Sequence, residues 1–204
     1  IMLLMPSKAF GSILLFERLT LFLLPLWVLA WDYPDQHRPV WQPAVVAVVV
    51  LLGVANVGRF AAFGNEMRNL SAVLDTMEER QTLMYFPVVP VTAGFTQPVH
   101  FHSGVWYQAQ HRGITDFNFA FFFPALVRFR DGAHSWVPND SVVWQPMQFE
   151  WERSNGPFYR YFLVRSPLDM RGQIFKGNVG KVKLLKQQGW WWLYGPAEEQ
   201  PQLP

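Results

Sequence analysis

The chain has 204 residues, of which 17 are Lys or Arg and 15 are Asp or Glu, and it contains no cysteine. A net charge of +2 argues against a nucleic-acid partner, and the lack of cysteine excludes disulfides, thiolate metal ligands and a cysteine nucleophile. Half of the residues are apolar, and the long apolar runs lie before residue 64. This composition predicts a membrane anchor joined to a folded domain.

Two apolar runs come first in the chain. GSILLFERLTLFLLPLWVLAW covers residues 11–31, and PAVVAVVVLLGVANVGRFAAF covers residues 43–63. Each is long enough to cross a bilayer as a helix, and the loop between them has the prolines, acids and aromatic residues typical of an interface. We therefore expect residues 1–63 to form an antiparallel transmembrane hairpin in lipid. Because the chain begins directly in apolar sequence, we expect it to be a fragment of a longer polytopic protein whose upstream spans contact this hairpin.

Residues 64–195 predict a small α/β (α+β) domain with a mixed sheet. The order is an amphipathic helix with a possible N-cap at Asn65, a strand, a short helix, one or two strands, a strand, a short helix and a β-hairpin. These elements are expected at residues 64–81, 82–88, 103–112, 117–132, 158–166, 166–176 and 179–195. The last residues, 196–204, are expected to be disordered.

Three of the five histidines lie close together in the sequence PVHFHSGVWYQAQHRG. His100 and His102 share a face only if the segment is extended, and His111 fits neither a helical nor an extended site with them. No zinc-binding helix motif accompanies them. The spacing therefore favours hydrogen-bonded or interfacial histidines, with His102 as the one to mutate first, and we expect no metal and no cofactor.

The other candidate binding residues are aromatic or charged. Trp106 and Tyr107 could stack on a sugar, although aromatic residues in such a helix more often pack against a sheet. Arg128 and Arg130 alternate along a strand and could hold a phosphate or carboxylate, but such a pair is more often a solvated face. Glu17 and Arg18 form an ionisable pair within or beside a predicted span, which is costly and therefore usually functional.

The segments occur in a familiar order. The apolar run with Glu17 and Arg18, the second span, LMYFPV, VHFHSGVWYQAQHRGITDFNFAFFFPALVRFRDG, FYRYFLVRSP and KVKLLKQQGWWWLYG together resemble the C-terminal part of large bacterial polytopic membrane proteins of glycosyltransferase type. The resemblance implies transfer of a sugar from a lipid-linked phosphate donor. In that superfamily the catalytic carboxylates lie in an early loop, and nothing in this chain corresponds to it.

The resemblance thus implies an accessory C-terminal portion of the enzyme that is inactive alone. It also implies a bacterial inner-membrane protein with the domain outside the cytoplasm, whereas Lys8, Arg59 and Arg68 on the domain's side would favour the cytoplasm. We follow the resemblance and expect Glu17 and Arg18 to lie near the lipid-phosphate sugar. The alternative is a self-standing two-span membrane protein whose α/β domain binds a partner or a carbohydrate.

Overall fold

The computed structural model describes residues 8–9, 12–13, 42–92, 94–95, 97–117 and 144–198. The chain divides into two compact units, Ile1–Leu52 and Gly53–Pro204. In the first unit, β1 (Lys8–Ala9) pairs antiparallel with β2 (Ser12–Ile13), so the start of the first predicted span is extended rather than helical. The rest of that span lies outside the described residues, as does most of the strand region predicted at 117–132.

The second apolar run and the predicted exit helix form one continuous helix, α2 (Gln42–Leu74). Asn65 therefore does not cap a new helix, and its side chain instead accepts a hydrogen bond from Arg68 (3.2 Å). Over the described part of the chain, no helix combines the length and the mean hydropathy that crossing a membrane requires. Several apolar side chains of α2 are nevertheless more than half exposed: Val48, Val50, Leu51, Val54, Val57 and Phe60.

The second unit contains a five-stranded mixed sheet with the order β4-β3-β5-β7-β6. Its strands are β3 (Thr82–Phe86), β4 (Ile114–Thr115), β5 (Tyr161–Arg165), β6 (Val182–Gln188) and β7 (Trp191–Pro196). Strand β3 is parallel to both β4 and β5, whereas β7 is antiparallel to β5 and β6. This arrangement confirms the predicted α+β class and the C-terminal hairpin, whose second strand continues to Pro196.

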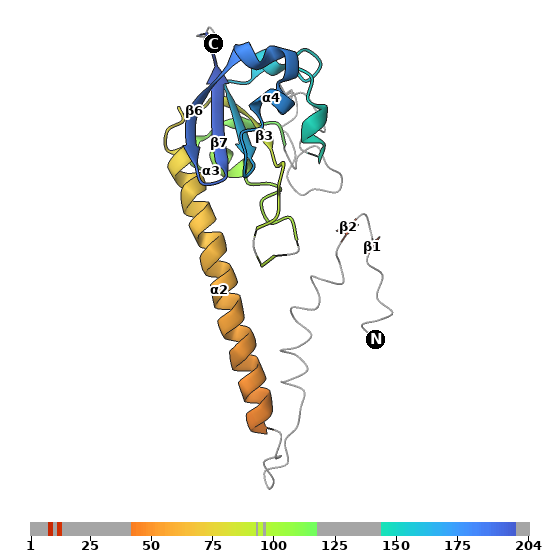
Figure 1. The fold of residues 1–204 in the computed structure, drawn as a ribbon, viewed down its shortest axis with the longest axis vertical. Helices are drawn as coiled ribbons and strands as arrows, with labels where there is room; N and C mark the ends of the chain where they lie inside the picture. Colours follow the sequence, from red (N-terminus) through yellow and green to blue (C-terminus); the bar gives the residue numbers. More distant parts are fainter. Residues whose placement is uncertain are drawn as a thin grey trace, which may run out of the picture. The chain divides into compact units, whose positions relative to one another are not determined.

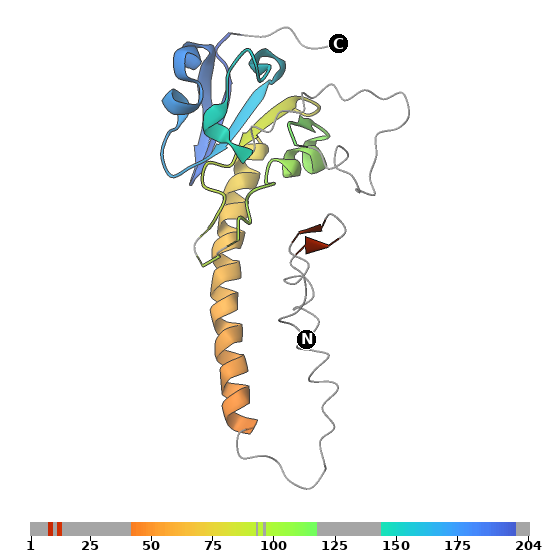
Figure 2. The ribbon, with the colours of Figure 1, turned by 90° about the vertical axis from the view of Figure 1, so that its right-hand side faces the viewer.

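Alternation along the central strands divides the core into two layers, because successive side chains of a strand point to opposite faces. One layer contains Leu83 and Tyr85 of β3 with Leu163 of β5, and it is covered by α2 and by α3 (Val105–His111). The other contains Met84 and Phe86 and is covered by α4 (Arg171–Ile174). Figures 1 and 2 show α2 and α3 on one face of the sheet and α4 on the other. Since both faces are covered, β3 and β5 are buried along their whole length.

Short helical turns complete the second layer. They are the 3-10 helices η4 (Pro146–Gln148), η5 (Gly156–Phe158) and η6 (Lys176–Lys181). The helix predicted over 166–176 is reduced to the single turn α4, where Asp169 accepts the Arg171 amide (2.8 Å), as expected of an acid near a helix start.

Candidate functional site

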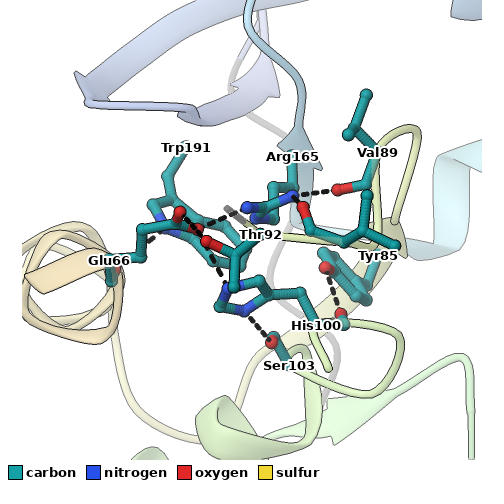
Figure 3. Close-up of polar contacts among 9 residues, drawn as sticks. Glu66, Tyr85, Val89, Thr92, His100, Ser103, Arg165 and Trp191 are labelled. Carbon is teal, nitrogen blue, oxygen red and sulfur yellow. Dashed lines mark hydrogen bonds and ion pairs between the residues drawn. The ribbon is translucent and has the colours of Figure 1, made fainter. Parts of the chain in front are cut away.

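Among the residues that the structure describes, the most highly connected polar group joins α2 to the sheet. We call it the Glu66 cluster; it comprises Glu66 on α2, Thr92 and His100 in the loop after β3, and Arg165 at the end of β5 (Figure 3). The four residues come from three separate segments of the chain, because Thr92 and His100 share the loop after β3. The fold brings them together because β3 and β5 are adjacent and α2 packs across them.

The Glu66 carboxylate is the centre of the cluster. One oxygen, Oε1, accepts a hydrogen bond from the Thr92 hydroxyl, and the other, Oε2, accepts one from Nη2 of Arg165. His100 Nε2 lies 2.9 Å from the same Oε2 atom. Trp191 Nε1 donates to the main-chain carbonyl of Glu66 (3.1 Å), so both the backbone and the side chain of this residue are held by the sheet.

Arg165 is fully buried, which is rare for an arginine unless it is paired. Its Nη1 atom donates to the carbonyls of Val89 and Val91, the second at 2.9 Å. The guanidinium carbon lies 5.0 Å from the ring centre of Trp190 and 5.6 Å from that of Trp191, within cation–π range. The guanidinium therefore ties the loop after β3 to both α2 and the β6–β7 hairpin.

His100 is also fully buried. Its ring stacks on Phe63 (centres 5.1 Å apart) and meets Trp191 edge-on (5.4 Å), and its Nδ1 lies 3.2 Å from the Ser103 hydroxyl. Burial, followed by the charge of Arg165, lowers the pKa of His100 to about 4. At neutral pH the ring is therefore uncharged, with Nε2 beside the Glu66 carboxylate and Nδ1 beside the Ser103 hydroxyl.

Burial alone would raise the pKa of the Glu66 carboxyl. Hydrogen bonds from Thr92 and Arg165, together with the charge of Arg165, outweigh burial and hold that pKa below its usual range. At neutral pH the cluster thus contains one carboxylate, one guanidinium and one neutral imidazole. Because His100 and Arg165 have no exposed surface, the arrangement is suited to positioning α2 on the sheet rather than to proton transfer with a substrate.

The structure separates the three histidines that lie close together in sequence. His100 belongs to the Glu66 cluster, whereas His102 packs between Phe101 (4.9 Å) and Phe117 (4.4 Å), where burial lowers its pKa. His111 stacks on Tyr107 at 5.4 Å. Among the residues that the structure describes, no group of three or more His, Cys, Asp or Glu side chains could hold a metal ion.

The remaining predicted binding residues fall into two groups. Tyr107 is buried, and its hydroxyl donates to the Glu78 carbonyl (2.6 Å) and accepts from the Gln81 amide (3.1 Å), so it braces the end of α3 against the turn before β3. Trp106 is 48% exposed and belongs to neither core layer. The other four lie outside the described residues: Glu17, Arg18, Arg128 and Arg130.

Sequence reasoning missed Glu66, His100 and Arg165 as a group. One local signal pointed to Arg165, because YFLVR is a continuously apolar strand that ends in a charge and not an alternating one. An arginine buried at the end of such a strand needs an acidic partner nearby, but the sequence does not say which acid is that partner. Comparison with protein-family models, with curated proteins and with solved structures finds no match to this chain.

Proposed function

We propose that the chain is the C-terminal, accessory portion of an integral membrane glycosyltransferase that uses a lipid-linked sugar donor. In this proposal the apolar residues 43–63 lie in the membrane, and the α+β unit is the domain that follows them at the extracytoplasmic face of a bacterial inner membrane. The observation that carries the proposal is the continuity of α2 from exposed apolar residues into the core of the domain.

The exposed side chains support a lipid environment for the first part of α2. Val54, Val57 and Phe60 are each at least 64% exposed in a helix whose sequence from Pro43 to Phe63 is apolar apart from Asn56 and Arg59. A row of exposed apolar side chains along one helix is normally shielded from water by another apolar surface. Lipid can provide that surface on all sides of a helix.

The Glu66 cluster supports a fixed rather than a hinged attachment. Leu70, Val73 and Leu74 at the end of α2 are buried in the core, and Glu66 is bound through both its carbonyl and its carboxylate. These contacts make the last turns of α2 part of the domain's own core. Such a domain can form one wall of a site at the membrane surface.

An accessory role is consistent with how the partly buried Glu66 and the buried Asp116 are used. Glu66 is held by Thr92, His100 and Arg165, and Asp116 Oδ1 accepts the Tyr85 amide (3.2 Å). A catalytic base must reach the proton that it removes, and a carboxylate enclosed in this way does not. In this proposal the catalytic carboxylates belong to the upstream part of the enzyme, as the resemblance implies.

Two measurements test the proposal. The coding sequence upstream of Ile1 should encode further apolar spans and an early loop with paired acids, and an upstream region without them would remove the glycosyltransferase assignment. Independently, the chain should remain in the membrane pellet after alkaline carbonate extraction of cells that express it. Release into the supernatant would contradict the membrane anchor.

A further inference from the structure

One end of the five-stranded sheet presents exposed apolar side chains. Because β3 and β5 are parallel, their carboxyl ends meet at this end, and the turn between the antiparallel strands β6 and β7 lies beside them. Each of these three connections contributes one exposed apolar side chain: Val91 after β3 (39% exposed), Leu168 after β5 (69%) and Trp190 in the hairpin turn (42%). We call these three residues the apolar rim.

The buried Arg165 holds the rim together. Its guanidinium donates to the Val91 carbonyl (2.9 Å) and lies 5.0 Å from the centre of the Trp190 ring. The Ser166 amide donates to the Trp190 carbonyl (2.9 Å), and the Ser166 hydroxyl accepts from the Leu168 amide (3.2 Å). The three exposed side chains therefore belong to one supported surface, unlike the isolated apolar residues that are common on soluble proteins.

The two ends of the sheet differ in charge. The segments that form the rim end, residues 87–104, 166–168 and 187–190, contain no Asp, Glu, Lys or Arg. At the opposite end, a groove is lined by two acids and two bases: Glu78, Glu198, Arg160 and Lys183. A domain with one charged end and one uncharged apolar end is suited to the boundary between water and an apolar phase.

Helix α2 leaves the domain at the rim end of the sheet. Glu66 binds Arg165 there, and residues 53–65 of α2 extend beyond the sheet (Figures 1 and 2). Phe95, from the same loop as Val91, packs on Phe60 and Phe63 of this projecting part, with ring centres 5.9 and 6.1 Å apart. The rim is therefore continuous with the exposed apolar residues of α2.

From this geometry we infer that the apolar rim inserts into the head-group region of the lipid bilayer, so that the α+β unit contacts the membrane directly. The inference rests on the proposed function, because it requires residues 43–63 to lie in the same bilayer. Trp190 is of the residue type enriched at membrane interfaces, and the rim would reach about 5–10 Å into the boundary between head groups and acyl chains. Since the rim segments carry no charge, the contact does not require anionic lipids.

The test is fluorescence of the full chain in phosphatidylcholine nanodiscs, with a nitrobenzoxadiazole label on one introduced cysteine, because the wild type has none. Leu168→Cys and Trp190→Cys report on the rim, and Val54→Cys reports on the anchor. Lipids with a nitroxide on the head group should quench both rim labels more than lipids with a nitroxide deep in the acyl chain, and this order should be reversed at Val54→Cys. The control is Leu184→Cys on β6, where the side chain is 43% exposed and the label should respond mainly to iodide in the water.

A charged variant separates insertion of the rim from insertion of the label. Leu168→Asp, read with the label at Trp190→Cys, should increase quenching by iodide and decrease quenching by the head-group nitroxide, because a carboxylate is costly to bury in an apolar phase. Leu184→Asp, read with the same label, should change neither. Both substitutions are at exposed positions, so thermal unfolding should give similar Tm values for the two variants.

The possible outcomes distinguish failure of the rim from failure of the anchor. If the rim labels are as open to iodide as Leu184→Cys while lipid quenches Val54→Cys, the inference is overturned and the anchor stands. Rim labels shielded from both iodide and nitroxide lipids would mean that a protein surface, such as a second copy of the chain, covers the rim, which also overturns the inference. If iodide and no lipid quenches Val54→Cys, the proposed function fails and the inference fails with it.

Discussion

Glu66→Gln should destabilise the protein strongly although it changes a single atom of a half-buried side chain. The substitution keeps the shape of the carboxylate but leaves Arg165, which has no exposed surface, without its counter-charge. Removing one partner of a buried pair costs about 3–5 kcal/mol. Since the Glu66 side chain is 24% exposed, and since Arg165 retains the Val89 and Val91 carbonyls, we expect the lower end, about 3 kcal/mol.

The assay is thermal unfolding of the full chain in nanodiscs, followed by tryptophan fluorescence. For a protein of this size about 3 kcal/mol corresponds to a fall in Tm of roughly 6–12 °C. The matched control is Glu152→Gln, which makes the same chemical change in an exposed pair with Lys181 (3.3 Å), where we expect at most about 0.5 kcal/mol. Equal shifts for the two variants would refute the structural role of the Glu66 cluster.

Four further predictions follow from named contacts. Combining Arg165→Met with Glu66→Gln should cost clearly less than the sum of the two single changes, because the double variant buries no unpaired charge; additive losses of Tm would count against a coupled pair. Both His100 and Glu66 have lowered pKa values in the fold, so the unfolded chain binds more protons and the free energy of unfolding should decrease as the pH is lowered. The His100 contribution, on the order of 3 kcal/mol for a pKa of about 4 against 6.5, is present above pH 6.5 and is lost toward pH 4. In chemical unfolding experiments, His100→Gln should therefore weaken the pH dependence of the free energy of unfolding over that window. Tyr107→Phe should cost about 1–3 kcal/mol, because the Gln81 amide and the Glu78 carbonyl both lose their partner, and a Tm equal to that of the wild type would show that water replaces the hydroxyl. Gly113→Ala should lower Tm, because the new Cβ would lie 2.0 Å from the Tyr107 ring, whereas Gly172→Ala in α4 meets nothing within 4 Å and should leave Tm unchanged or raise it.

Local patterns were sufficient to predict several elements of the fold. The apolar segment TLMYF, the short helix after Ser103 and the strand YFLVR all occur as β3, α3 and β5. The hairpin was also predicted, because Gln188 and Gly189 mark a turn and Gly189 adopts a positive φ of 57°. These features depend on periodicity and turn chemistry over a few residues.

Other features depend on contacts between distant segments. The glycine and asparagine at 64–65 suggested a break between two helices, but the packing of Leu70 and Leu74 on the sheet keeps α2 continuous. The parallel pairing of β3 with β5 joins strands that are far apart in the sequence, and periodicity carries no information about such partners.

The Glu66 cluster shows the same difficulty at the level of single residues. Read separately, Glu66 is an ordinary polar residue of an exit helix, and His100 looks equivalent to His102. Only the fold makes them different, because it buries His100 against Phe63 and Trp191 and brings Arg165 to the same carboxylate. The sequence could nominate a buried arginine at the end of β5 but not its partner.

Cysteine accessibility along α2 tests the proposed anchor most directly, because the wild-type chain contains no cysteine. Val54→Cys lies on the exposed apolar part of the helix, and Glu152→Cys replaces a side chain that is 80% exposed on the α+β unit. In intact bacteria, a membrane-impermeant maleimide should label Glu152→Cys. The same reagent should leave Val54→Cys unlabelled, both in intact cells and after lysis without detergent. Labelling of Val54→Cys to the same extent as Glu152→Cys would show that water and not lipid surrounds α2, and the membrane anchor would have to be abandoned.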